Sequence, residues 1–182
     1  YHAGQRGIVM ADKKRMGRQD PTSYRYCDFE PEHSLYQEAL ELYRKTGREA
    51  YEWQGNLLKP IMATEEDGLW THQKFGYSLP RRNGKTEIIY MFEMWGLEKG
   101  LNILHTAHRI STSHASFEKV KSYLEDMGLE DKAHFTSIKA KGQEKIVLLE
   151  TGGTIQFRTR TITGGLGEGF DMLIIDEAQE YT

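Results

Sequence analysis

Short runs of β-branched and aromatic residues alternate with longer segments of helical periodicity in the second half of the chain. Runs of the first kind predict strands and segments of the second kind predict helices. From residue 75 the pattern predicts a strand, a helix, a second strand and a second helix over 75–79, 85–98, 101–107 and 112–127. Strands that follow each other through a helix form parallel crossovers. An α/β fold is therefore expected.

Further elements are predicted on both sides of this region. Apolar residues recur at helical spacing over 31–46, and a shorter helix over 51–63 is expected to break near Pro60. Strands are predicted at 135–138, 146–150, 154–159 and 172–175, the second and third of them joined as a hairpin. The last run is wholly apolar, which is typical of a strand buried on both faces of a parallel sheet. We expect a mainly parallel sheet flanked by helices.

Composition excludes several classes of protein. The 182 residues are 38% hydrophobic, which is enough to bury a core and excludes a disordered chain. The net charge of -3 gives no bulk attraction to nucleic acid, so a polyanion would have to be held locally. The single cysteine, Cys27, cannot form an internal disulfide. No run approaches the roughly 18 apolar residues of a membrane span, and no signal peptide pattern is present. A soluble intracellular protein without membrane partners is expected.

The first 30 residues are predicted to form an N-terminal arm. Residues 1–27 carry six Lys or Arg residues against two Asp residues. Such a segment is either a solvated, partly disordered end or a basic arm that contacts DNA or a neighbouring subunit. The chain begins with Tyr1, and Met10 opens a sequence typical of a gene start. Residues 1–9 are therefore expected to derive from cloning, and the folded domain is expected over 31–182.

A phosphate-binding loop is predicted at Leu79-Pro80-Arg81-Arg82-Asn83-Gly84-Lys85-Thr86, between an expected strand and an expected helix. Such loops need backbone N–H groups that converge on a phosphate, a helix N-terminus, a lysine for the outer phosphates and a hydroxyl for Mg²⁺. Gly84, Lys85 and Thr86 fill the last three positions of the Walker A pattern G-x-x-x-x-G-K-T, but Leu79 stands where the first glycine is expected. Alone, the tripeptide is more often a helix start with an exposed lysine.

The acidic pair Asp176-Glu177 directly follows the apolar run 172–175 and matches a Walker B arrangement. There the Asp holds the Mg²⁺ shell and the Glu polarises the attacking water. The alternative is a buried strand that ends in a solvated acidic turn. Ligands of open α/β sheets bind at the carboxyl ends of the strands. We therefore predict that Lys85 and Asp176 converge around a metal-bound triphosphate.

Three segments resemble the large terminase subunits of tailed bacteriophages. They are S-L-P-R-R-N-G-K-T at 78–86, I-L-H-T-A-H-R-I-S-T-S at 103–113 and G-F-D-M-L-I-I-D-E-A-Q-E at 169–180. With Trp53-Gln54 upstream, the resemblance spans roughly residues 50–182. It implies a P-loop NTPase of the additional-strand, catalytic-glutamate type. The implied activity is ATP hydrolysis coupled to translocation of double-stranded DNA into a procapsid.

The resemblance also implies roles for single residues. Arg82, Asn83, Gly84, Lys85 and Thr86 would bind ATP, with Thr86 and Asp176 as Mg²⁺ ligands. Glu177 would activate the hydrolytic water. Arg81 would contact the γ-phosphate and sense hydrolysis, whereas Arg82 is more often a neighbouring or backbone contact. Both arginines could instead be solvated loop charges.

Trp53-Gln54 resembles the glutamine motif that reads adenine in this family, because a carboxamide can pair with both N6 and N7 of the base. The alternative is a core Trp53 with an exposed Gln54, and Gln73 is a less favoured adenine reader. Three histidines, His105, His108 and His114, are expected to be structural or substrate-facing because their spacing does not suit a metal site.

The implied partners are double-stranded viral DNA, the portal protein, the procapsid and the small terminase subunit, in a homo-oligomeric ring in the host-cell cytoplasm. Family members continue beyond the position of Thr182 with a coupling motif, further strands and a nuclease domain. Residues 31–182 are therefore expected to be the N-terminal part of an ATPase domain with an incomplete sheet and weak or no turnover. Two alternatives remain open: a helicase-like P-loop ATPase acting on nucleic acid, and a nucleotide-binding fragment without turnover.

Overall fold

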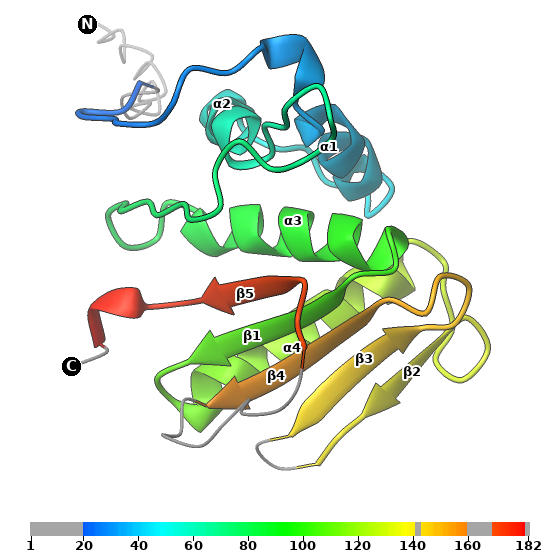
Figure 1. Ribbon diagram of the computed structural model, residues 1–182. Coiled ribbons are helices and arrows are strands. Elements are labelled where there is room, and N and C mark those ends of the chain that lie inside the picture. The colour runs from blue at the N-terminus through cyan, green and yellow to red at the C-terminus, as the bar shows by residue number, and fades with distance from the viewer. Residues whose placement is uncertain (1–19, 141–142, 160–168, 181–182) are drawn as a thin grey trace, which may run out of the picture.

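The computed structural model describes residues 20–140, 143–159 and 169–180. These residues form an α/β fold in which a five-stranded mixed sheet is flanked by helices (Figure 1). Residues 1–19 of the predicted arm lie outside the described ranges, and residues 20–28 are exposed chain without regular structure. No helix in the described ranges has the length and apolar character needed to cross a membrane.

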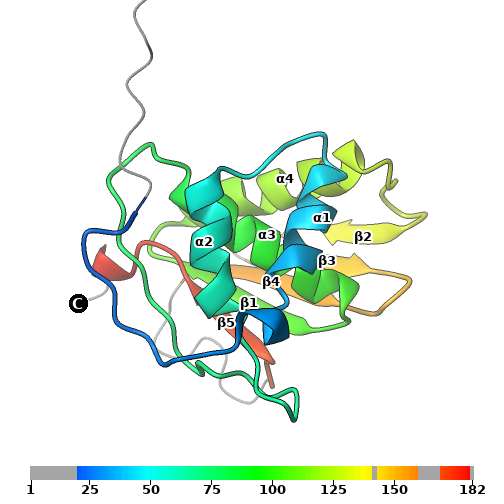
Figure 2. The same ribbon diagram turned by 90° about the horizontal axis from the view of Figure 1, so that it is seen from above.

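The two N-terminal helices form the layer farthest from the sheet. A 3-10 turn over Pro31–His33 precedes α1 (Tyr36–Arg44), and α2 spans Glu52–Ile61. Pro60 lies in the last turn of α2, and the helix ends one residue later, because a proline ring obstructs continuation of the helical hydrogen bonds. The predicted break near Pro60 is confirmed. Figures 1 and 2 show α1 and α2 on the side of α3 away from the sheet.

The next two helices pack on the sheet. Helix α3 spans Lys85–Glu98 as predicted, and α4 spans Ile110–Asp126. Most side chains of α3 are buried, because the helix lies between the sheet and the α1–α2 layer. Gly96 allows this close packing, since a Cβ there would lie 2.7 Å from Ile103 Cδ1 on the sheet.

The strands are ordered β2-β3-β4-β1-β5 across the sheet. Their bounds are Asn102–Ala107 for β1, Phe135–Ile138 for β2, Glu144–Leu148 for β3, Thr154–Thr159 for β4 and Met172–Ile175 for β5. Strand β1 is parallel to β4 and to β5, whereas the β2–β3 and β3–β4 pairs are antiparallel. The predicted hairpin is confirmed, and it is the reason that the sheet is mixed rather than mainly parallel.

The strand predicted at 75–79 is absent from the described part of the chain. Phe75, Tyr77 and Leu79 are half-buried and pack on the core, while Gly76 and Ser78 are exposed, which is the alternation of a strand. However, the backbone of this segment joins none of the five strands. Alternation reports which side chains are buried, but a strand also needs a hydrogen-bonded neighbour, and that neighbour is not encoded locally.

Strand β5 differs from its prediction in burial. Leu173 and Ile175 are 57% and 49% exposed, whereas Met172 and Ile174 pack against the core. Met172 and Ile174 are in register with Ile103 and His105 of β1, and so lie on the face that the helices cover. The prediction of burial on both faces is wrong, because β5 is an edge strand whose other face has no covering layer among the described residues.

Candidate functional site

Residues 79–86, hereafter the 79–86 loop, enter α3 through an unusual backbone. Gly84 is the residue before the helix and has a φ of 74°, and Arg82 has a φ of 65°. The Asn83 side-chain amide donates to the Pro80 carbonyl at 3.1 Å and closes the loop on itself. Left-handed residues in a short loop can turn successive N–H groups toward one side, as in anion-binding nests. The helix N-terminus adds its own free N–H groups.

Leu79 replaces the first glycine of the predicted pattern without backbone strain. Its φ is not in the positive range, and its half-buried side chain packs against the core. Position 79 therefore has no need of glycine, and a leucine there anchors the start of the loop to the helices.

The cationic and hydroxyl groups of the loop are uncommitted. Lys85 and Thr86 lie in the first turn of α3 and are half-buried, and Arg81 and Arg82 are exposed. Among the described residues, none of these four side chains makes a hydrogen bond or an ion pair. They are available to an anionic ligand.

Gln54 is buried at the start of α2 and is 2% exposed. Its Oε1 accepts the Tyr51 N–H at 2.8 Å, and its Nε2 donates to the Gly84 carbonyl at 3.0 Å. The alternative of an exposed Gln54 is wrong. Gln54 therefore contacts the 79–86 loop through the backbone carbonyl of Gly84. Adenine reading by Gln54 stays a prediction.

The acidic pair lies at the carboxyl end of β5. Asp176 is 6% exposed; its N–H donates to Thr106 O at 2.9 Å and its Oδ1 accepts the Glu177 N–H at 2.9 Å. Glu177 is half-buried and has a φ of 54°. A left-handed conformation in a non-glycine residue costs of order 1–3 kcal/mol and clusters at functional sites. Asp176 is therefore held by hydrogen bonds of its backbone and its side chain, whereas Glu177 has a strained backbone conformation.

Tyr77 is hydrogen-bonded to the start of α3. Its hydroxyl donates to the Lys85 carbonyl at 2.9 Å. Burial raises the pKa of Tyr77 well above its usual range, and the negative charges of Asp176 and Glu93 raise it further. The same phenol thus contacts the Lys85 backbone and lies within electrostatic reach of Asp176. Tyr77 was not predicted as a site residue and entered only as part of the strand expected over 75–79.

A buried ionisable pair lies between α3 and β1. Glu93 of α3 and His105 of β1 are both 0% exposed, and Glu93 Oε1 is 2.6 Å from His105 Nδ1. Burial alone would lower the pKa of His105, but the carboxylates of Glu93 and Asp176 outweigh it and raise the pKa. Glu93 Oε2 and His105 Nε2 have no partner among the described residues. His105 is one of the three histidines expected to be structural or substrate-facing, and its carboxylate partner Glu93 was not predicted.

Glu87 ties the first turn of α3 to two other helices. Its Oε2 accepts the hydroxyl of Tyr43 from α1 at 2.8 Å and that of Tyr123 from α4 at 2.5 Å. Burial, together with the Glu87 carboxylate, raises the pKa of Tyr43 to about 12. A carboxylate in the first turn also interacts favourably with the helix dipole. The helix that carries Lys85 and Thr86 is thus fixed at its start.

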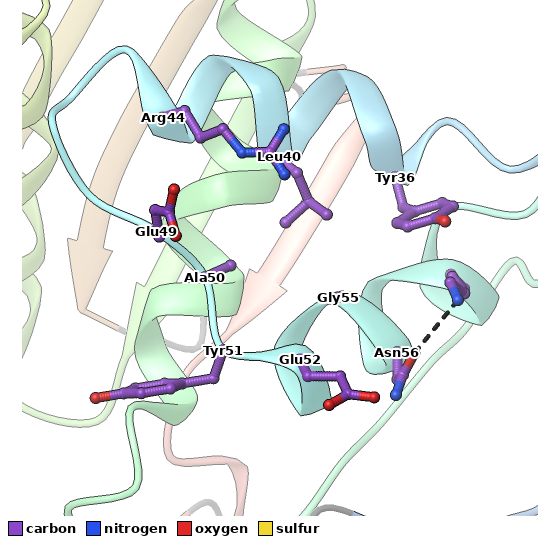
Figure 3. Close-up of a pocket in the computed structure, with 10 residues that line it drawn as sticks. Tyr36, Leu40, Arg44, Glu49, Ala50, Tyr51, Glu52, Gly55 and Asn56 are labelled. Carbon is purple, nitrogen blue, oxygen red and sulfur yellow. Dashed lines mark hydrogen bonds between the residues drawn. The ribbon is translucent and has the colours of Figure 1, made fainter.

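A groove of about 210 Å³ lies between α1 and α2 (Figure 3). It is lined by polar and aromatic side chains that include Tyr36, Arg44, Tyr51 and Asn56. None of the predicted site residues lines it. Tyr51, which lines the groove, donates its N–H to Gln54 Oε1 at 2.8 Å.

The described residues offer a Mg²⁺ ion a partial set of ligands rather than a complete one. No group of three His, Cys, Asp or Glu side chains suited to a metal ion occurs in the described ranges. Mg²⁺ is commonly held by one or two carboxylates together with substrate phosphates and waters, rather than by an all-protein cage. The Asp176 carboxylate and the Thr86 hydroxyl, which has no hydrogen bond within the described ranges, are the oxygen groups suited to such a partial set, and Mg²⁺ binding by them stays a prediction.

Comparison of this chain with protein-family models, with curated proteins and with solved structures gave no match.

Proposed function

We propose that the 79–86 loop binds the phosphates of ATP and that the chain is the P-loop ATPase part of a DNA-packaging motor. The loop combines a helix N-terminus, two left-handed residues and basic side chains that have no partner in the part of the chain that the structure describes. Backbone N–H groups at a helix start and a nearby lysine are the groups that hold phosphates. Arg81 would approach the γ-phosphate, where a guanidinium stabilises transferring charge.

Asp176 and Glu177 are proposed to complete the site. Asp176, with Thr86, would hold Mg²⁺, which when bound supplies positive charge to the phosphate oxygens. Glu177 would act as general base toward the attacking water, a role worth at least ~100-fold in rate. The observation that carries the proposal is the entry into α3, where left-handed Arg82 and Gly84 precede Lys85 and Tyr77 donates to Lys85 O at 2.9 Å.

The DNA-packaging role rests on the three segments that resemble terminase large subunits. The partners it proposes are double-stranded DNA, the portal protein, the procapsid and the small terminase subunit, with the chain acting in a ring. A helicase-like ATPase is the second candidate, because Asp176-Glu177-Ala178-Gln179 also occurs in helicases. ATPase stimulation by a blunt duplex without strand separation would favour the motor, and ATP-dependent strand separation would favour the helicase.

Calorimetric titration of the chain with Mg-ATP tests nucleotide binding. The wild-type chain is expected to bind, and Lys85→Ala to abolish binding, because the ammonium on the outer phosphates is lost. Lys99→Ala is the matched control: Lys99 follows the other end of α3 and pairs with Glu38 at 2.9 Å on the surface. Unchanged affinity in Lys85→Ala would refute the assignment of the phosphate loop.

A further inference from the structure

The two backbone carbonyls around Lys85 are each held by a side chain from outside α3. The Gly84 carbonyl accepts Gln54 Nε2 at 3.0 Å and also the Glu87 N–H at 3.2 Å. The Lys85 carbonyl accepts the Tyr77 hydroxyl at 2.9 Å. Gln54 belongs to α2 and Tyr77 precedes the 79–86 loop, so both reach the start of α3 from other parts of the fold.

Holding these carbonyls fixes the direction of two N–H groups. In a planar trans peptide the N–H points opposite to the C=O of the preceding residue. The Gly84 carbonyl therefore sets the direction of the Lys85 N–H, and the Lys85 carbonyl sets that of the Thr86 N–H. Both belong to the first turn of α3, where N–H groups lack intrahelical acceptors.

We propose that Gln54 and Tyr77 form a clamp that orients the Lys85 and Thr86 N–H groups toward a bound polyphosphate. The inference rests on the proposed function and makes both side chains positioning residues for phosphate rather than for the nucleoside. Preorganised N–H donors bind an anion more tightly because less motion is lost on binding.

The surroundings of Gln54 favour this role. The amide is buried, and its Oε1 already accepts the Tyr51 N–H at 2.8 Å, which fixes Nε2 as the end facing Gly84. A Cβ at position 84 would lie only 3.2 Å from that Nε2, so glycine allows the close approach. With both amide ends bonded to backbone, the clamp acts on the phosphate loop whatever base the ligand carries.

Two substitutions separate the clamp from other roles. Gln54→Met is neutral, similar in size and loses the donor to Gly84, and Tyr77→Phe removes only the hydroxyl. Tyr90→Phe is the matched control, because Tyr90 is also buried, lies on α3 and donates to Ser116 Oγ at 3.3 Å, away from the loop. The affinities of the full chain for Mg-ATP, Mg-GTP and inorganic tripolyphosphate are measured by calorimetry, with the Tm of each variant.

The clamp predicts that Gln54→Met and Tyr77→Phe each weaken all three ligands by a similar factor, roughly threefold to tenfold, the loss expected for one hydrogen bond. Tyr90→Phe is expected to leave the three affinities unchanged even where it lowers Tm as much as Tyr77→Phe does. A loss by Gln54→Met for ATP alone would make Gln54 an adenine reader and overturn the clamp. Tripolyphosphate affinity in Tyr77→Phe equal to that of Tyr90→Phe would also overturn it.

The same titrations distinguish this inference from the proposed function. If Lys85→Ala binds Mg-ATP like the wild type, the phosphate loop itself is wrong. If Lys85→Ala loses binding while both clamp variants retain it, only the clamp is wrong.

Discussion

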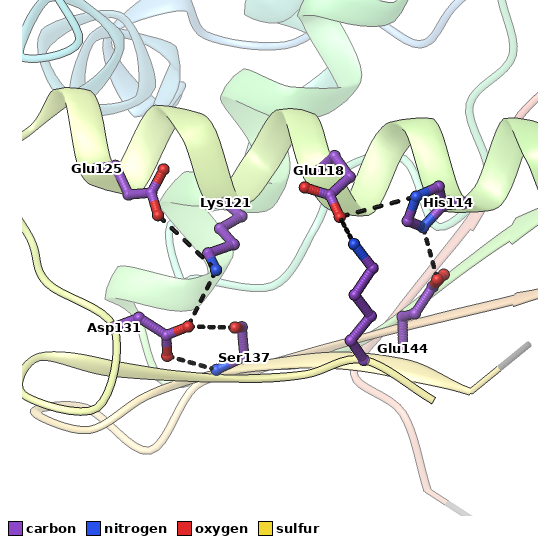
Figure 4. Close-up of polar contacts among 8 residues, drawn as sticks. His114, Glu118, Lys121, Glu125, Asp131, Ser137 and Glu144 are labelled. Carbon is purple, nitrogen blue, oxygen red and sulfur yellow. Dashed lines mark hydrogen bonds and ion pairs between the residues drawn. The ribbon is translucent and has the colours of Figure 1, made fainter. Parts of the chain in front are cut away.

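Two polar regions at opposite edges of the sheet differ in how their polar and charged side chains are paired. On the α4–β2–β3 side, charged groups bond to one another (Figure 4): His114 Nδ1 lies 2.7 Å from Glu144, and Lys121 lies 3.0 Å from Asp131. At the α3–β5 end, the side chains of Lys85 and Thr86 have no partner among the described residues. Charges that satisfy each other hold elements together, whereas charges left uncommitted at a helix start are available to a ligand.

Positive φ angles in non-glycine residues are divided unevenly between the same two regions. Arg82 and Glu177 are two of the three described non-glycine residues with positive φ, and they lie in the 79–86 loop and after β5. The third, Lys132, lies next to Asp131 in the turn before β2, and its N–H is bonded to the Phe135 carbonyl. Lys132 thus lies in a turn of the paired region, whereas Arg82 and Glu177 belong to the segments with a proposed ligand.

The largest effect is expected from the buried pair that lies between the two regions. Glu93→Ala would leave the His105 imidazole buried without its carboxylate, so the free energy of unfolding should fall by about 3–5 kcal/mol. Lys139→Ala, which breaks an exposed pair with Glu118, should cost less than about 1 kcal/mol. Urea denaturation measures both. Equal costs would show that the Glu93–His105 pair does not stabilise the fold as its burial suggests.

Turnover should depend on Glu177 in a way that binding does not. In the ATP-hydrolysing protein, Glu177→Gln is expected to bind Mg-ATP with unchanged affinity and to lose at least ~100-fold in kcat, because the carboxamide cannot accept a proton. Glu180→Gln serves as control, since Glu180 is exposed in the 3-10 turn after β5. Normal hydrolysis by Glu177→Gln would place the base elsewhere.

Stability should depend on pH through His105. Its pKa is raised in the folded state, so its contribution is fully present below the ordinary value of 6.5 and is lost as the pH rises through the folded pKa. The free energy of unfolding of the wild type should therefore fall as the pH rises above 6.5. His105→Gln should lack this decline. A wild-type curve that rises with pH over this range would mean that His105 is neutral in the folded state.

Apart from the control Lys139→Ala, the smallest effect on the free energy of unfolding is expected for Asp131, in the α4–β2–β3 region. Hydrogen bonds from Ser137 and the ion pair with Lys121 lower the pKa of Asp131 to about 2. This stabilisation is present above 3.8 and is lost as the pH falls through about 2. Asp131→Asn should lower the free energy of unfolding at pH 7 by about 1–2 kcal/mol and leave Mg-ATP affinity unchanged. A weaker affinity would show that the two regions are coupled.

Local patterns predicted most of the elements but not how they pair. The bounds of α3, β2, β4 and β5 follow from periodicity and turn residues, which are local signals. The missing strand at 75–79 and the exposed face of β5 depend on which strands become neighbours, and that choice is made by contacts far apart in the sequence.

The contrast between local patterns and contacts far apart in the sequence also explains which parts of the site were predicted. Lys85, Thr86 and Asp176 stand in recognisable patterns. The bonds of Gln54 to Gly84 and of Tyr77 to Lys85, however, depend on how α2 and the segment before the loop approach α3. Side-chain chemistry can be read from a motif, whereas the residues that hold a motif in place come from tertiary packing.

Paramagnetic broadening with Mn²⁺ in place of Mg²⁺ measures directly whether the two motifs share one ligand. With a non-hydrolysable ATP analogue bound to the ¹⁵N-labelled chain, the amide resonances of Lys85 and Thr86 and those of Asp176 and Glu177 should broaden together. Those of Lys121 and Asp131 should stay sharp. Broadening at only one of the two motifs, or at neither, would contradict a common triphosphate site.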